Sequence, residues 1–291
     1  MPVPPGSTLR LNMPQWQGGS FPEYHFGGQL LAWLAPAAEG PVETVSVPEP
    51  AAGETLSLEN GMRGRSAVVR QAREARQRIE RHQPARILTL GGDCLVDLAP
   101  IAYLNKRYGG KLGVLWVDAH PDVATPSSYP NPHAHVLGAL LGRGDRDLTG
   151  EVEAPLAPSR VMFAGLDAWS PVEGKVIEGL GLRHAGAAAL AVTSAPALDW
   201  ISEQHIEHVA IHFDLDVLDP TAFRPLNFNQ PGLPPDAYPG VPRGRMLPDQ
   251  VVRLLNDVAR ACDVVGLAIT EHLPWDTLAM RNLLRQLPLM S

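Results

Sequence analysis

The chain is poor in features that several classes of protein require. Its 291 residues include only two cysteines, which excludes a disulfide framework. No apolar run reaches the roughly 18 to 20 residues that a membrane-spanning helix needs. Lysine and arginine number 24 against 31 aspartates and glutamates, the net charge is -7, and no basic cluster forms a stripe for phosphates. We therefore expect neither a nucleic-acid nor a membrane partner.

The chain also has no internal repeat and no long linker. Its first residues, 1–6, lack the charged and apolar regions of a signal peptide. The densest basic stretch, 63–81, has the pattern of a helix whose arginines face solvent. We expect a cytoplasmic enzyme that forms a single domain over residues 1–291, a length that suits one large α/β domain.

What the chain does contain is an alternation of strand-like and helix-like segments. Several strand-like runs are continuously apolar, which predicts burial by helices on both faces. The predicted strands are Thr8–Leu11, Val42–Val47, Arg86–Leu90, Leu112–Val117, Val161–Gly165, Val209–Phe213 and Val264–Ile269. The predicted helices include Gln29–Trp33, Ser66–His82, Asp97–Tyr108, His135–Leu141, Pro196–His205 and Pro248–Ala261. This order predicts a three-layer α/β fold with a doubly wound, mostly parallel sheet.

Acidic motifs directly follow two of the predicted strands. DAHPD (118–122) follows the fourth strand, and DLD (214–216) follows the sixth. Alternate residues of an extended chain point the same way, so the acids and the histidine of each motif can project together. In a doubly wound sheet the ligand site lies beyond the carboxyl ends of the strands. We therefore expect both motifs to contribute to one site.

Several carboxylates and an imidazole that converge at one sheet edge would be costly to bury without compensating charge. A pair of divalent cations is the simplest compensation. The two motifs therefore predict a two-metal hydrolytic site that activates water near neutral pH.

The full series of motifs resembles that of the arginase/agmatinase (ureohydrolase) family. In order, the motifs are GGDC (91–94), DAHPD (118–122), a following histidine, FAGL (163–166), DLDVLDP (214–220) and TEHLP (270–274). The resemblance covers nearly the whole chain from Arg86 to Pro274. It implies an arginase/deacetylase-like fold, two Mn²⁺ ions, and hydrolysis of a guanidino group to urea and an amine.

The resemblance also implies which residues hold the metals. One ion would be held by Cys94, Asp118, Asp122 and Asp214. The other would be held by Asp118, His120, Asp214 and Asp216, so that Asp118 and Asp214 bridge the ions. Glu271 would hold the substrate guanidinium, since this planar cation pairs naturally with a carboxylate. Asp122, Glu271 and a histidine would then be the catalytic residues.

Two histidines compete to donate a proton to the leaving amine. Counting forward from Asp122 favours His135, whereas counting back from the helical segment 137–142 favours His133. We prefer His133 because a helix is a firmer anchor than a loop, and we place His135 among the substrate contacts. The histidines outside the motifs are interpreted as surface or packed residues and not as ligands: His25, His82, His184, His205, His208 and His212.

Cys94 departs from the family pattern, because most members have a histidine at this position. A thiolate is a softer ligand that suits zinc, iron or copper better than manganese. Cys94 is therefore either a true ligand, a weak ligand that lets one site empty, or an inert buried thiol.

The segments that would contact the rest of the substrate depart from the pattern as well. Arginases have an asparagine where this chain has Ala124, and a Ser-Gly-Asn in the region that is shortened here to 127–132. The family's aspartate after FAGL appears as Ser170, and Glu173 matches its acidic partner. Expected substrate contacts are Asn131, His135, Ser170, Glu173 and Glu271.

A long segment, 223–231, follows the DLDVLDP motif. Loops at this edge of the sheet tend to carry specificity. Arg224, Asn229 or Gln230 could therefore meet a substrate carboxylate.

We predict a hydrolase of non-peptide C–N bonds in linear amidines, with arginine or an Nω-modified arginine as substrate. An agmatinase-like or guanidino-acid hydrolase is the runner-up, and a formimino hydrolase is a further alternative. Deacetylase relatives use a single zinc and a His-His pair that this chain lacks. A metal-poor, non-catalytic guanidine-binding relative is the alternative from another class, which Cys94 favours and the intact acidic motifs oppose. The resemblance also suggests a homo-oligomer.

Overall fold

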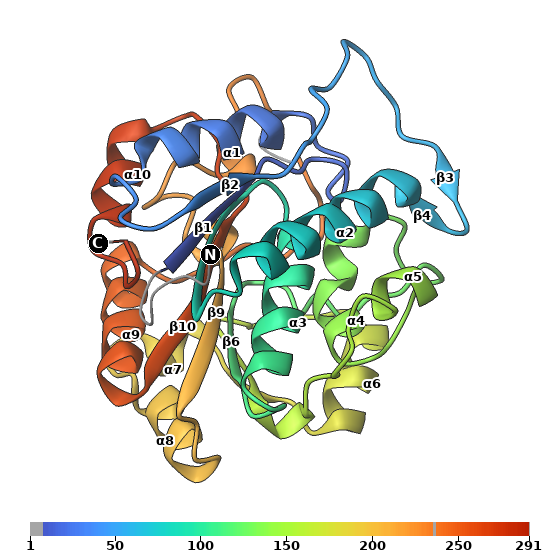
Figure 1. The fold of residues 1–291 in the computed structure, drawn as a ribbon. Coiled ribbons are helices and arrows are strands. Elements are labelled where there is room, and N and C mark those ends of the chain that lie inside the picture. The colour runs from blue at the N-terminus through green and yellow to red at the C-terminus, as the bar shows by residue number, and fades with distance from the viewer. Residues whose placement is uncertain (1–7, 235–236, 291) are drawn as a thin grey trace.

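The computed structural model describes residues 8–234 and 237–290. An eight-stranded sheet lies at its centre in the order β2-β1-β5-β10-β9-β6-β7-β8, and all its paired strands are parallel (Figure 1). The strands are β1 (Thr8–Met13), β2 (Val42–Thr44), β5 (Arg86–Gly91), β6 (Gly113–Val117), β7 (Val161–Ala164), β8 (Arg183–Ala185), β9 (His208–Asp214) and β10 (Asp263–Thr270). A small antiparallel hairpin pairs β3 (Leu58–Glu59) with β4 (Met62–Arg63).

Helices cover both faces of the sheet (Figure 1). Side chains of one set of helices fill the core on one face: α2 (Arg65–His82), α3 (Leu98–Arg107), α4 (Val136–Leu140), α5 (Arg146–Thr149) and α6 (Pro171–Leu180). The other face is covered by α1 (Glu23–Leu34), α7 (Ala187–Leu190), α8 (Ala195–Glu203), α9 (Pro248–Ala261) and α10 (Thr277–Leu284). The predicted three-layer, doubly wound architecture is therefore confirmed.

Strand β6 shows why the central strands are apolar without alternation. Val114 and Trp116 enter the core beside α2 and α3, whereas Leu115 and Val117 enter the core on the opposite face. Successive strand residues point to opposite faces, and both faces of this sheet exclude water. Continuous apolar runs are therefore what a central strand of this sheet requires.

All predicted strands lie in the sheet, and all predicted helices coincide with observed ones, with bounds that differ by a few residues. The largest difference is in α1, which begins at Glu23 and not at Gln29. Gly27 and Gly28 weaken the helical pattern there, because glycine has low helix propensity. The fold uses Gly27 for close packing, since an added Cβ would overlap the backbone carbonyl of His272.

Several short or glycine-containing elements were not predicted. They are β3, β4, α5, α6, β8, α7 and α10. Strand β8 has three residues at a sheet edge, and α6 contains Gly174 and Gly179, so neither carries a strong periodic signal. The prediction of a single domain over 1–291 includes residues outside the described ranges and stays a prediction. Among the described residues, no helix has both the length and the apolar character needed to cross a membrane.

The basic segment predicted to be a solvent-facing helix is α2. Its arginines pair with acidic residues of neighbouring elements: Arg65 with Asp145 at 2.9 Å and Arg78 with Glu43 at 2.6 Å. These partially exposed ion pairs contribute little stability individually. The ion pairs nevertheless show that the arginines of α2 face acidic residues of the neighbouring elements.

Candidate metal centre and active site

The carboxyl ends of four neighbouring strands meet at one pocket of about 540 Å³. Cys94 follows β5, Asp214 ends β9, and Glu271 follows β10, and all three line this pocket. Asp118 follows β6 and is fully buried beneath them. The motifs therefore lie together at the carboxyl edge of the sheet, as the strand order requires.

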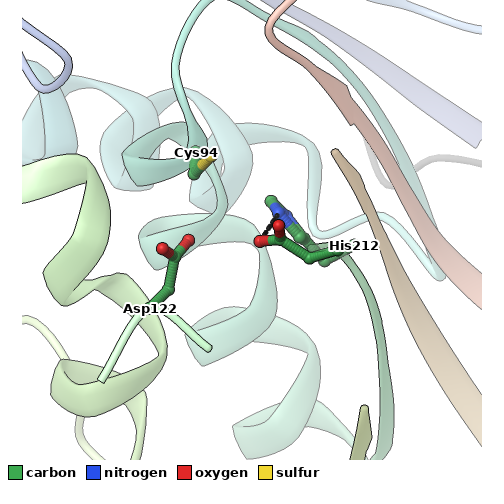
Figure 2. A group of neighbouring side chains, drawn as sticks. Cys94, Asp122 and His212 are labelled. Carbon is green, nitrogen blue, oxygen red and sulfur yellow. Dashed lines mark ion pairs between the residues drawn. The ribbon is translucent and has the colours of Figure 1, made fainter. Parts of the chain in front are cut away.

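Possible metal ligands form overlapping groups in this region, and within each group the ligand atoms lie within 4.8 Å of one another. The first group is Cys94, Asp118, Asp122 and His212, and the second is Asp118, His120 and Asp216. A third group contains Cys94, Asp214 and Glu271. Asp118 belongs to the first two groups, which is the position that a bridging ligand would have. Figure 2 shows Cys94, Asp122 and His212 around a common space.

Buried polar atoms without partners support a metal centre in this cluster. Four such atoms have no hydrogen-bond partner: Nε2 of His120, Oδ2 of Asp122, Nε2 of His212 and Oδ1 of Asp216. Folded proteins pair almost all buried polar atoms, so a concentration of exceptions requires an explanation. Divalent cations would bind these imidazole and carboxylate atoms. The residues present therefore fit a metal centre.

Asp118 is held as a carboxylate by its neighbours. Its Oδ1 accepts a hydrogen bond of 2.7 Å from the His120 backbone N–H, and its Oδ2 accepts one of 3.0 Å from Trp116 Nε1. Burial raises the pKa of Asp118, but electrostatic interactions with His120 and His212 lower this pKa by more, so it lies below its usual range. Asp118 is therefore negatively charged and ready to bind a cation.

Other acids in the cluster have raised pKa values. Burial and then the charge of Asp118 raise the pKa of Asp122 well above its usual range. Burial and then Asp216 do the same for Asp214, and they raise the pKa of Glu271 to about 8. Bound cations would reverse this effect, because their positive charge would stabilise the ionised acids.

The backbone is strained at two of these acids. Asp122 has φ 50° and Glu271 has φ 64°, both in the left-handed region that non-glycine residues rarely adopt. The backbone N–H of Glu271 donates to Gly92 O at 2.6 Å, and the carbonyl of Asp122 accepts from Gly138 N at 3.0 Å. Such strain costs on the order of 1–3 kcal/mol and concentrates at functional sites.

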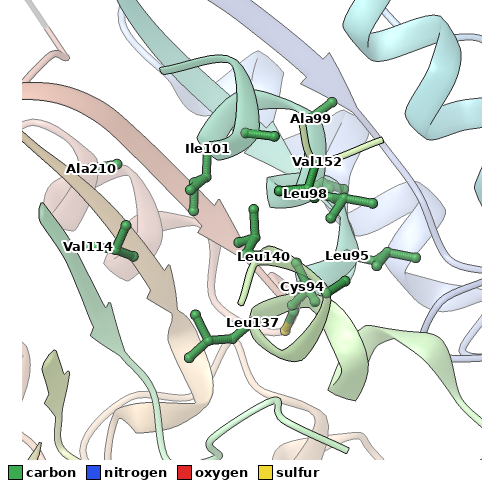
Figure 3. Packing of buried hydrophobic residues seen from close by; sticks show 14 of the residues in the cluster. Cys94, Leu95, Leu98, Ala99, Ile101, Val114, Leu137, Leu140, Val152 and Ala210 are labelled. Carbon is green, nitrogen blue, oxygen red and sulfur yellow. The ribbon is translucent and has the colours of Figure 1, made fainter. Parts of the chain in front are cut away.

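Cys94 lies between the hydrophobic core and the acidic cluster. It begins a short 3-10 helix and belongs to the same core as Leu95, Leu98 and Leu137 (Figure 3). Its Sγ donates to Asp214 Oδ2 at 2.9 Å. Burial and then the charge of Asp214 raise the pKa of Cys94 well above its usual range, so Cys94 would have to lose its proton to hold a cation as a thiolate.

Tyr24 is a site residue that sequence analysis missed. It lies on α1, and its hydroxyl donates to Glu271 Oε2 at 2.6 Å. Tyr24 is buried and lines the pocket. Nothing in its local sequence marks it, because the interaction joins residues from opposite ends of the chain.

The two competing histidines lie in different places. His133 lines the pocket, and its Nδ1 is 3.0 Å from the carbonyl oxygen of Gly18. Burial is the main cause that lowers the pKa of His133 to about 4. His135 is buried, its Nε2 is 2.8 Å from the Tyr129 carbonyl, and it is not among the residues that line the pocket. The position of His133 agrees with our preference, and its role stays a prediction.

The remaining predicted substrate contacts lie on the pocket wall. Asn131 lines the pocket, and its Nδ2 donates to Gly19 O at 3.2 Å. Ser170 and Glu173 also line it, where they form a capping box that begins α6. The Glu173 carboxylate accepts the Ser170 backbone N–H at 2.8 Å, so this side chain already has a structural role.

The segment after the DLDVLDP motif reaches the pocket through residues other than those predicted. Asn227, Phe228 and Tyr238 line the pocket, whereas Arg224, Asn229 and Gln230 are not among its lining residues. The Asn229 amide instead donates to the carbonyls of Pro220 and Phe223. The segment therefore contributes aromatic surface and not a cation for a substrate carboxylate.

Gly92 allows the strand ends to approach closely enough to form this site. An added Cβ would overlap the backbone carbonyl of Gln15. We expect Gly92→Ala to lower the free energy of unfolding by about 1–3 kcal/mol, as overpacking does. Gly179→Ala is the matched control, because nothing lies near an added Cβ in this exposed part of α6. The control should raise stability by about 0.5–1 kcal/mol, measured by urea unfolding. Equal stability of the two variants would contradict the close-packing role of Gly92.

Comparison with known proteins adds an independent observation. The family model described as "Arginase family" matches residues 40–226, which is more than half of the chain. The chain belongs to the arginase family. The resemblance inferred from the ordered motifs is therefore confirmed.

Individual relatives in this family are distant. The arginase of Entamoeba histolytica is 29% identical over 141 residues, which cover 46% of this chain and 48% of that protein. The arginase of Bacillus caldovelox is 31% identical over 143 residues, which cover 46% of this chain and 47% of that protein. The chain thus spans about half the length of the curated relatives it matches.

Solved structures of the arginase family extend the likeness over nearly the whole fold. Native arginase from Bacillus caldovelox has a TM-score of 0.78 at 20% identity, covering 96% of this chain and 97% of that chain. Entamoeba histolytica arginase in complex with L-ornithine has a TM-score of 0.74 at 20% identity, covering 96% and 95%. Formimidoylglutamase from Bacillus subtilis has a TM-score of 0.68 at 15% identity, covering 96% and 85%. At these identities the likeness shows the fold alone, and it confirms the predicted arginase-like architecture.

Proposed function

We propose that this arginase-family protein hydrolyses a C–N bond of a guanidino group and releases urea and an amine. One observation carries the proposal: the acidic cluster with unpartnered buried ligand atoms shares a pocket with the carboxylate of Glu271. The cluster fits divalent cations, and the glutamate fits a guanidinium. A hydrolase of linear amidines needs both in contact with one substrate.

The proposed cofactor is a pair of divalent cations, with Mn²⁺ as the family's expected metal. As the family resemblance implies, Cys94, Asp118, Asp122 and Asp214 would hold one ion, and Asp118, His120, Asp214 and Asp216 would hold the other. The observed groups support Cys94, Asp118 and Asp122 for the first ion and Asp118, His120 and Asp216 for the second, while Asp214 lies in the group with Cys94 and Glu271. When bound, such cations supply Lewis acidity and lower the pKa of a water molecule so that it can attack at neutral pH.

Glu271 would orient the guanidinium. Its Oε2 is fixed by the Tyr24 hydroxyl at 2.6 Å, so the carboxylate has a defined direction within the pocket. A carboxylate and a guanidinium form a bidentate, charge-assisted pair. This pairing would hold the guanidinium carbon beside the acidic cluster and exclude neutral competitors.

His133 would move the proton that the leaving amine needs. Its low pKa keeps the ring neutral near pH 7, and the contact of Nδ1 with Gly18 O assigns the ring proton to Nδ1. Nε2 then has a free lone pair. It can take a proton from the attacking water and pass that proton to the departing nitrogen.

The charge of the pocket favours a cationic substrate. Two divalent cations would balance the four aspartates, which leaves a Cys94 thiolate, Glu173 and Glu271 to make the pocket negative. Among the described residues that line the pocket, there is no lysine or arginine. Arginine, Nω-modified arginine and agmatine therefore fit better than a guanidino acid.

A panel of guanidino compounds tests the proposal, with protein that has been stripped of metal and reloaded with Mn²⁺. The compounds are arginine, Nω-hydroxyarginine, agmatine, guanidinobutyrate and guanidinopropionate. We expect urea release, with kcat/KM for agmatine or arginine at least about tenfold above that for the guanidino acids, or about 1.4 kcal/mol. Metal content is measured on the same samples.

The other outcomes of this panel discriminate among alternatives. No urea from any compound, with two metals bound, would contradict the guanidino proposal and favour formimino substrates. No urea with one metal or fewer would favour a non-catalytic guanidine-binding protein. A homo-oligomeric state and a cytoplasmic location stay predictions, the first of which sedimentation velocity tests directly.

A further inference from the structure

The sequence favoured a surface or packed position for His212 over a role as a ligand, but the structure buries it beside the metal cluster. It belongs to β9 at the centre of the sheet, and its side chain is fully buried. The ring stacks on Trp116 with 3.7 Å between centroids and 13° between planes. Its Nδ1 is 2.6 Å from Oδ2 of Asp97, which is also buried. The imidazole is therefore held in one orientation by two independent contacts.

The other ring nitrogen of His212 lies in the metal cluster. Nε2 has no hydrogen-bond partner and is 3.7 Å from Asp118 Oδ2. His212 forms a fully buried group with Cys94, Asp118 and Asp122, whose ligand atoms all lie within 4.8 Å of one another (Figure 2). Asp122 Oδ2 in this group also has no partner. One group of possible ligands thus contains two buried atoms without a partner, an imidazole nitrogen and a carboxylate oxygen.

We infer that His212 Nε2 is a direct metal ligand and that it completes one metal site with Cys94, Asp118 and Asp122. In this chain His212 would supply the imidazole that the family pattern places at the position of Cys94. The inference deepens the proposed function, because it concerns the metal centre of the same pocket.

Asp97 would be the positioning residue for this ligand. Metal-bound histidines usually donate their second ring N–H to a carboxylate, which fixes the tautomer and strengthens the ligand. The Asp97–His212 contact has this arrangement, since it assigns a proton to Nδ1 and leaves Nε2 for the cation.

The donor set determines which metal this site prefers. A thiolate and an imidazole beside the carboxylates make this site softer than a site built only from oxygen and nitrogen donors, which suits Mn²⁺. The site should therefore favour Zn²⁺, Co²⁺ or Fe²⁺. The second site, with His120 and Asp216, keeps the harder donor set, so the two ions need not be the same element.

A competing interpretation makes His212 an imidazolium that only bridges Asp97 and Asp118. The two interpretations differ in what happens when Nε2 is removed. A structural ion pair would affect folding stability without changing the spectrum of a bound metal, whereas loss of a ligand would change both affinity and spectrum.

The test is a Co²⁺ titration of the metal-free full chain, followed by absorption spectroscopy, calorimetry and metal counting. His212→Asn keeps an amide near Nδ1 for Asp97 but has no atom at Nε2. We expect the wild type to bind two Co²⁺ with a thiolate-to-metal band. His212→Asn should bind one of them at least tenfold more weakly with altered ligand-field bands, and Cys94→Ser should lose the thiolate band.

His208→Asn is the matched control. His208 lies on the same strand, and its ring stacks on Tyr108 at 4.1 Å, so the variant loses a similar aromatic contact away from the cluster. Its Co²⁺ affinity and spectrum should equal those of the wild type. Wild-type affinity and spectrum in His212→Asn would overturn the inference. If His212→Asn does not fold, Asp97→Asn gives the same test, with an expected loss of about 10–100-fold in affinity.

The result is separable from that of the proposed function. A weakened Co²⁺ site in His212→Asn together with an inactive, two-metal wild type would support the ligand and contradict the guanidino hydrolase. Urea release by the wild type with unchanged Co²⁺ binding in His212→Asn would support the guanidino hydrolase and contradict the His212 ligand.

Discussion

Asp122→Asn should lower the turnover of the Mn²⁺-loaded protein by at least about a thousandfold, or about 4 kcal/mol. Asp122 is buried, its Oδ2 has no partner in the protein, and it lies with Cys94 and Asp118 in one group of possible ligands. The substitution replaces a negatively charged donor with a neutral amide in contact with a cation. Urea release and metal content measured on the same sample check the prediction.

The backbone conformation at position 122 suits asparagine as well as aspartate, so the substitution changes the charge without changing the loop. Asp122 has φ 50°, and asparagine is among the residues that tolerate this conformation best, so the loop should keep its shape. Asp219→Asn is the control, because this aspartate accepts hydrogen bonds from Thr221 at the end of the DLDVLDP motif. The turnover of Asp219→Asn should stay within about twofold of the wild-type turnover, because surface substitutions usually have small energetic effects. Full turnover by Asp122→Asn with two bound metals would exclude the proposed centre.

Glu271→Gln should lower kcat/KM for a guanidino substrate by about a hundredfold to a thousandfold. Removing one charge from a buried ion pair costs about 2–5 kcal/mol, because the remaining charge is left uncompensated. The glutamine keeps an oxygen for the Tyr24 hydroxyl, so the effect should come from the lost charge and not from a displaced side chain. Steady-state kinetics on the preferred substrate check the prediction.

Metal counting separates two roles for Glu271. Its carboxylate lies in a group with Cys94 and Asp214, so it could in principle hold a cation instead of the substrate. We expect Glu271→Gln to retain two metals per chain while its KM rises. Loss of one metal would assign Glu271 to the metal centre and contradict its substrate role. Glu178→Gln, an exposed change on α6, makes the same chemical replacement away from the pocket and should leave kinetics unchanged.

Local patterns were enough to predict most of the fold. The apolar run before Asp118 is continuous because β6 is buried on both faces, and a run of this kind is visible in the sequence. The parallel order brings the residue after each central strand to one edge of the sheet, so the convergence of Asp118, Asp214 and Glu271 followed from strand positions alone. The weakly periodic elements α6 and β8 were missed because their sequences carry little local signal.

Counting residues left two candidates for the predicted proton-transfer histidine, with a preference for His133. His133 and His135 lie two positions apart, and the loop before them differs in length from the family pattern. Only the packing of that loop decides which ring faces the pocket. In the structure His135 is turned to the Tyr129 carbonyl, and His133 lines the pocket next to Gly18.

The sequence by itself determined most strands of the sheet, the longer helices and the acidic motifs, because hydrophobic periodicity and short motifs depend on neighbouring residues. The tertiary structure alone decided which distant side chains join those motifs. Tyr24 and Glu271 are 247 positions apart, and Asp97 and His212 are 115 apart. Both contacts depend on how α1, the 3-10 helix Cys94–Asp97 and the strands pack together. No local pattern records such packing, which is why these two pairs were found only in the folded chain.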